Sequence, residues 1–99
     1  MMDSHNKTVS GFITLHNGTT ISRDFYSRVL AATLVGFATM PTGKPMTLRK
    51  ICGKEFWLTL HSSETSLAGF CGVTMVSKGD VMLTLAGKDG KNAQRYLKE

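Results

Sequence analysis

The sequence predicts an α+β domain in which a small antiparallel sheet, built from hairpins, packs on one central helix. The first observation is a long apolar segment with a helical period, residues 22–40. The second is a series of short β-prone runs, separated by glycine-containing turns, on both sides of that segment. Together they predict the element order β-β-α-β-β-β-β-α.

The central helix is predicted over residues 22–40, where apolar side chains recur at three- and four-residue steps in two adjacent rows. Such rows give a broad buried face rather than a narrow stripe. Ser22 is suited to the N-cap, Asp24 lies in the first turn where negative charge suits the helix dipole, and Pro41 ends the helix. We therefore expect the sheet to pack against this helix.

The N-terminal part is predicted to form a flexible tail over residues 1–7, and residues 8–99 a single domain. Residues 8–21 indicate a first hairpin, because Asn17-Gly18 between two β-prone runs favours a type I′ turn. Side chains alternate along its first strand. One face is expected to carry Val9, Ile13 and Leu15, and the other Phe12, Thr14 and His16.

After the helix, two prolines and a glycine in residues 40–45 predict an exposed connection. Residues 46–51 and 55–61 are interpreted as a second hairpin. The second run alternates well, whereas Leu48 and Ile51 differ in parity, which we interpret as a bulge on the first strand.

The C-terminal third is predicted to begin with a polar loop, residues 62–69. The runs at 73–76 and 81–85 flank a turn-forming segment and predict a third hairpin. Residues 91–99 are expected to form a short amphipathic helix, with Tyr96 and Leu97 facing inward.

One stretch supports an alternative interpretation. Leu67-Ala68, three residues and then Gly72-Val73-Thr74 resemble the L-A-x-x-x-G-V-T core of helix-turn-helix DNA-binding domains. The resemblance implies a turn at Gly72, a recognition helix from Thr74, and a DNA-binding regulator. Such a helix would hold Gly79 in its interior, so a hairpin is preferred and the helix-turn-helix remains the alternative for residues 67–85.

Composition limits the function. A 99-residue chain with a formal charge of +5 is expected to meet a polyanionic partner, either nucleic acid or an acidic protein surface. The apolar runs are too short to span a bilayer and the first residues are polar, so a cytoplasmic location is expected; a homodimer is compatible with the sequence.

Catalysis and metal binding have little support in the sequence. The acidic residues are scattered, Cys52 and Cys71 form no C-x-x-C pair, and no histidine lies at a ligand spacing from either. We therefore expect no enzymatic activity, no metal and no cofactor.

Two basic clusters are the candidate binding residues: Lys44, Arg49, Lys50 and Lys54 with Trp57 close by, and Lys88, Lys91 and Arg95 near the C-terminus. The cations would neutralise phosphates and the tryptophan would stack on a base. The leading hypothesis is a regulator or accessory subunit that contacts nucleic acid or a nucleoprotein complex. The alternatives are a protein-binding inhibitor or adaptor of the kind used in phage–bacterial conflict, and the helix-turn-helix regulator.

Overall fold

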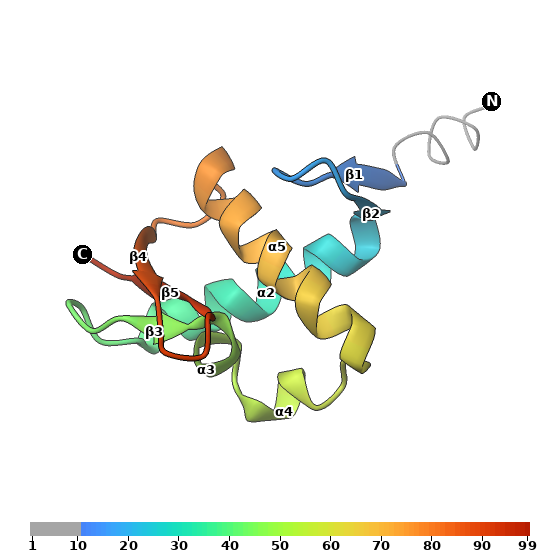
Figure 1. The fold of residues 1–99 in the computed structure, drawn as a ribbon. Helices are drawn as coiled ribbons and strands as arrows, with labels where there is room; N and C mark the ends of the chain where they lie inside the picture. The colour runs from blue at the N-terminus through green and yellow to red at the C-terminus, as the bar shows by residue number, and fades with distance from the viewer. Residues whose placement is uncertain (1–10) are drawn as a thin grey trace.

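The computed structural model describes residues 11–99, which form a small α+β fold with two antiparallel sheets and four helices (Figure 1). The predicted tail and residues 8–10 of the first predicted strand lie outside this range. The elements in order are β1 (Phe12–Thr14), β2 (Thr20–Ser22), α2 (Arg23–Thr39), β3 (Met46–Thr47), α3 (Leu48–Cys52), α4 (Lys54–Trp57), α5 (Ser62–Lys78), β4 (Thr84–Lys88) and β5 (Gln94–Leu97).

The central helix is confirmed as α2. The Oγ of Ser22 accepts a hydrogen bond from the backbone N–H of Phe25 at 3.3 Å, and the helix ends before Pro41. Its inner face is fully buried at Val29 and Thr33. The packing differs from the prediction, because α3 and α5 cover much of this face and the three-stranded sheet does not. The core is therefore formed largely between helices.

The first hairpin is also confirmed, with Ile13 opposite Ile21 in an antiparallel pair. Ile13 and Leu15 are buried, whereas Phe12, Thr14 and His16 are exposed, as the alternation predicts. The type I′ turn is wrong: Gly18 has a positive φ of 88° but Asn17 does not. The backbone N–H of Gly18 donates to the carbonyl of Leu15, so the loop is a turn followed by a left-handed glycine.

The predicted second hairpin is wrong. Only two of its residues, Met46–Thr47, form a strand, and the chain then enters α3 and α4. Thr47 caps α3 by accepting a hydrogen bond from the N–H of Lys50 at 3.4 Å. Leu48 and Ile51 are both buried. Their spacing, interpreted as a bulge, is the i, i+3 spacing of one helical turn.

The polar loop over residues 62–69 and the first strand of the predicted third hairpin are both parts of α5. The carboxylate of Glu64 accepts a hydrogen bond from the N–H of His61 at 2.9 Å, which starts the helix. At the other end Gly79 has a φ of 78° and its N–H donates to the carbonyls of the last turn. The glycine assigned to a hairpin turn therefore ends a helix.

The hairpin at the C-terminal end is formed by β4 and β5, so the predicted helix over residues 91–99 is wrong. Leu85 lies opposite Tyr96, and the register shifts between Leu85 and Lys88, beside Gly87 with a φ of 83°. Tyr96 faces inward as predicted, but from a strand. β3 pairs with the other edge of β5, which gives the strand order β3-β5-β4.

Two glycines allow the helices to cross closely. A Cβ on Gly36 of α2 would collide with the backbone carbonyl oxygen of Ile51 in α3. A Cβ on Gly72 of α5 would collide with the hydroxyl of Tyr96, and would lie 3.2 Å from Leu48 in α3. Gly72 lies inside the continuous helix α5, so neither the preferred hairpin nor the alternative helix-turn-helix with a turn at Gly72 is formed there.

A further helical segment lies earlier in the chain, between β3 and α5. α3 and α4 form a short helical segment interrupted at Gly53, which has a φ of 97°. Residues 58–61 then connect this segment to α5. The elements after β3 are thus a short interrupted helical segment, a four-residue connection, α5 and the β4–β5 hairpin.

Candidate nucleic-acid interface

The pairing of β3 with β5 brings the two basic clusters together. Thr47, directly before α3, lies opposite Arg95 in β5. Arg49 and Lys50 follow Thr47 in the first turn of α3, and Lys88 lies opposite Gln94, the neighbour of Arg95. In Figure 1 the loop between β4 and β5 lies beside α3. Residues almost 50 positions apart in the sequence thus contribute to one region of the molecule.

The net charge of the chain is concentrated in this region. Residues 40–61 and 84–99 carry eight cations and three acids, and the remaining described residues carry three of each. We call these eight cations the basic surface: Lys44, Arg49, Lys50, Lys54, Lys88, Lys91, Arg95 and Lys98. The whole excess of positive charge on the described chain belongs to this part, so a polyanion is attracted to it.

Two members of the basic surface also hold the fold together. The ammonium group of Lys98 donates to the carbonyl of Phe37 at 2.8 Å and lies 4.6 Å from the centre of its ring. This places a cation at the C-terminal end of α2, where the helix dipole favours it. The guanidinium of Arg95 is half-buried and donates to the carbonyl of Ala86 at 3.5 Å.

The other six cations are exposed. Arg28 pairs with Asp24 and Lys78 pairs with Asp80, both outside the basic surface. The six exposed cations therefore carry charge that no carboxylate in residues 11–99 neutralises by direct contact. This arrangement leaves them available to phosphates.

The hairpin loop holds two of these cations on a fixed backbone. The carboxylate of Asp89 accepts hydrogen bonds from the N–H groups of Lys91 at 2.8 Å and Ala93 at 2.9 Å. These two bonds hold the pKa of the Asp89 carboxyl below its usual range, the larger contribution coming from Ala93. Asn92 completes the loop with a φ of 68°. Asp89 thus organises the loop between Lys88 and Lys91.

Trp57, predicted to stack on a base, lies at the end of α4, half-buried and packed against the core. The exposed aromatic side chains of the described chain are Phe12 and Phe70. Phe12 belongs to β1 and Phe70 to α5, outside the basic surface. The sequence identified the aromatic residue nearest the basic cluster, but it could not show that the ring is largely used for packing.

The outer face of α5 was not identified from the sequence, because its residues were assigned to a loop and a strand. Its exposed side chains are four serines with one aromatic ring and one cation: Ser62, Ser63, Ser66, Phe70, Ser77 and Lys78. The edge of Phe70 packs against the ring of His16, with the centroids 6.3 Å apart. His16 also donates its backbone N–H to the hydroxyl of Thr74 at 2.9 Å, which fixes the first hairpin on α5.

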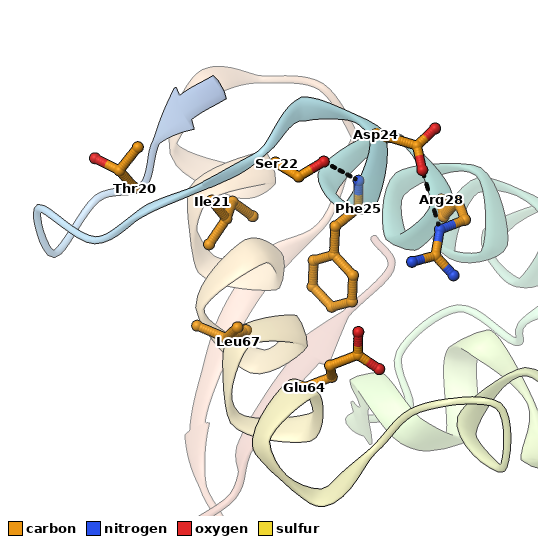
Figure 2. Close-up of a pocket in the computed structure, with 8 residues that line it drawn as sticks. All are labelled: Thr20, Ile21, Ser22, Asp24, Phe25, Arg28, Glu64 and Leu67. Carbon is orange, nitrogen blue, oxygen red and sulfur yellow. Dashed lines mark hydrogen bonds and ion pairs between the residues drawn. The ribbon is translucent and has the colours of Figure 1, made fainter. Parts of the chain in front are cut away.

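A hollow of about 330 Å³ lies between the first turns of α2 and α5 (Figure 2). Two carboxylates line it, and both are engaged: Asp24 pairs with Arg28 at 3.6 Å, and Glu64 accepts the hydrogen bond that starts α5. Ser22 is occupied by its capping bond to Phe25, also drawn in Figure 2. These polar groups stabilise helix ends and do not converge on a substrate.

The cysteines are not activated thiols. Burial raises the pKa of Cys71 to about 12. Burial also raises the pKa of Cys52, against a smaller opposing effect of its hydrogen bond with Thr33. A thiol with a raised pKa is protonated at neutral pH and is a poor nucleophile or metal ligand. Over residues 11–99, no three side chains of the metal-binding types gather at one place.

None of the helices within residues 11–99 combines the length and the apolar character needed to cross a membrane. The chain matches no protein-family model, no curated protein and no solved structure.

Proposed function

We propose that the protein binds double-stranded nucleic acid through the basic surface, as a non-enzymatic regulator or accessory subunit. The observation that carries the proposal is the β3–β5 pairing, which joins two separate basic clusters into the one region that bears the excess charge. Six exposed cations without a carboxylate partner in residues 11–99 are suited to contact phosphates on both sides of a groove.

The order of elements supports the same proposal. After α2 comes the short strand β3, then the α3–α4 segment joined to α5 by a short connection, and then the β4–β5 hairpin, whose strand β5 pairs with β3. This is the order of elements in a winged helix-turn-helix. In helix-turn-helix proteins the second helix enters the major groove while the first contacts the backbone. By this analogy α5 would face the groove, with α3 and the β4–β5 loop on the flanking phosphates.

A duplex is a better ligand for this surface than a single strand. Proteins that bind single strands stack bases on exposed aromatic side chains. Trp57 is half-buried and the exposed rings of Phe12 and Phe70 lie outside the basic surface. The surface therefore offers charge without a stacking platform, which suits the regularly spaced phosphates of a duplex.

Sequence preference is expected to be modest. Base reading in the major groove relies mainly on long side chains such as arginine, asparagine and glutamine. The exposed face of α5 carries serines and Phe70 instead, with Lys78 in its last turn. Small side chains allow a helix to approach a groove closely, but most of the binding free energy would come from phosphate contacts.

The experiment is fluorescence anisotropy with a labelled duplex and the matching single strand, titrated at several salt concentrations. If all six exposed cations contact phosphates, the logarithm of affinity falls with the logarithm of salt with a slope of about −5. The double variant Lys88→Ala/Lys91→Ala should reduce the magnitude of the slope by about 2 and weaken binding to all sequences alike.

The matched control is Arg23→Ala/Arg28→Ala, which removes two exposed cations of α2 that lie outside both the basic surface and α5. It should lower the affinity much less, because the long-range effect of net charge is screened by salt. Equal losses in the two double variants would contradict a localised interface. If the protein binds no nucleic acid at low salt, the proposal fails and the protein-binding alternative becomes the leading hypothesis.

A further inference from the structure

The outer face of α2 changes character along the helix. Its first half carries the exposed ion pair of Asp24 with Arg28. Between Arg28 and Thr39 the exposed side chains are all apolar. We call them the α2 stripe: Ala31, Leu34, Val35 and Ala38. Val35 is 73% exposed and Leu34 is 43% exposed. A contiguous apolar helix face of this kind usually contacts another surface.

We propose that the α2 stripe is covered by the α2 stripe of a second copy of the chain, in an antiparallel two-fold dimer. The inference does not depend on nucleic-acid binding, and Lys54 is the one cation that both proposals use. In the dimer it pairs with the partner's Glu55, which leaves five exposed cations of the basic surface for phosphates. The four side chains of the stripe are already exposed, so pairing needs no change in the fold.

The pattern of side-chain size along the stripe is the same in both directions, with a small residue at each end and two larger ones between them. Alanine, leucine, valine and alanine occupy positions i, i+3, i+4 and i+7. An antiparallel copy centred on the stripe places Ala31 opposite the partner's Ala38 and Leu34 opposite the partner's Val35. A two-fold interface requires such self-complementarity, because each contact occurs twice. The two alanines also allow the helices to approach closely, with the larger side chains between them.

A hollow beside the stripe offers room for the partner. It has a volume of about 470 Å³ and is lined by Ala32 and Val35 of α2 and by residues at the start of α4. Lys54 and Glu55 also line it, and these adjacent residues carry opposite charges. Across a two-fold axis, Lys54 of one copy can pair with the partner's Glu55 and the reverse.

Charge favours a second copy over a different partner. Two chains with a net charge of +5 repel each other except where the contact surfaces carry no net charge. The α2 stripe is uncharged, and Lys54 with Glu55 is neutral as a pair. An acidic partner would instead be attracted to the cations of α3 and the β4–β5 loop. The stripe is therefore the face on which two copies can meet.

The test is sedimentation velocity on the full chain from about 5 to 200 µM, since a small interface is expected to give a micromolar dissociation constant. The wild type should reach twice the 10.8 kDa monomer mass within this range. Val35→Glu should weaken the dimer at least about 10-fold. Ser27→Glu adds the same charge to an exposed position of α2 outside the stripe and should dimerise normally.

A mixing experiment identifies the contact. Leu34→Glu and Val35→Lys should each be monomeric alone, while an equimolar mixture should form a heterodimer because Leu34 of one copy lies opposite the partner's Val35, which brings the two opposite charges together. A wild type that stays monomeric at every concentration would overturn the inference. A dimer that Val35→Glu and Ser27→Glu weaken equally would also overturn it, as would a mixture that fails to associate.

Discussion

Replacing Gly72 by alanine tests the crossing of α5 over β5, on which the position of the β4–β5 hairpin depends. A Cβ on Gly72 would collide with the hydroxyl of Tyr96 and lie 3.0 Å from the ring carbon that bears it. Alanine gains about 1 kcal/mol over glycine inside a helix, but overpacking a core costs about 1–3 kcal/mol. Because the collision is with a buried group, we expect the cost to exceed the gain, so that Gly72→Ala lowers the free energy of unfolding by up to about 2 kcal/mol.

Tyr96→Phe removes the colliding atom. Tyr96 is 1% exposed and its hydroxyl has no hydrogen-bond partner within residues 11–99, so its removal should change stability by less than about 1 kcal/mol. In the Tyr96→Phe background the cost of Gly72→Ala should fall to about zero, since the contact with Leu48 at 3.2 Å needs only a small adjustment.

Urea titrations of the four proteins measure the coupling between the two positions, which we expect to be about 1–2 kcal/mol. Strictly additive effects would refute the crossing. So would a Gly72→Ala variant that is more stable than the wild type by the full helix-propensity gain.

Three further predictions concern the fold. Gly36→Ala should lower the free energy of unfolding by at least about 2 kcal/mol, because the new methyl group meets the backbone of Ile51, which cannot rotate away. An unchanged free energy in thermal unfolding would contradict the α2–α3 crossing. Tyr26→Phe removes the hydrogen bond that the Tyr26 hydroxyl donates to Asp80 at 2.7 Å and should cost about 1–2 kcal/mol in urea titration, whereas Asp80→Asn should cost less because an amide oxygen still accepts. Burial raises the pKa of Cys71 from 9.0 to about 12, so the stabilisation by its protonated thiol is complete below pH 9 and is lost toward pH 12. The free energy of unfolding should therefore fall as pH rises from 9 toward 12. Cys71→Ala should flatten this pH dependence between pH 9 and 10, and an unchanged slope would contradict the assignment.

Local sequence patterns predicted the elements that local interactions determine. The spacing of apolar residues, the cap at Ser22 and the stop at Pro41 are sufficient to locate α2. Asn17-Gly18 was sufficient for the first hairpin, although the turn type depends on the backbone of Asn17. These features lie within a few residues of one another, so their physical causes are visible in the sequence.

The errors arise where tertiary contacts override local preference. Val73 and Val76 favour strands, and Gly69 and Gly72 disfavour helices, yet all four lie in α5. Gly72 is required by the approach of Tyr96, a residue 24 positions later, which no local pattern contains. Leu48 and Ile51 did carry a helical spacing, but a single turn is too short to distinguish from an irregular strand.

The basic residues were identified from the sequence, but their proximity was not. Lys50 and Lys91 belong to one region only because β3 pairs with β5, and β5 was predicted to be a helix. The rest of the described chain adds no net charge, since residues 11–39 and 62–83 together carry three cations and three acids. Composition gave the number of cations, and strand pairing gave their arrangement.

Mapping the bound surface by NMR tests the central claim most directly. A ¹⁵N-labelled sample titrated with a short duplex reports which backbone amides change their environment. We predict that amides in the first turn of α3 and in the β4–β5 loop, residues 89–93, shift together and saturate at the same duplex concentration, while those of the α2 stripe do not shift. Shifts confined to the α2 stripe or the first hairpin, or separate saturation of α3 and the loop, would contradict a single interface on the basic surface.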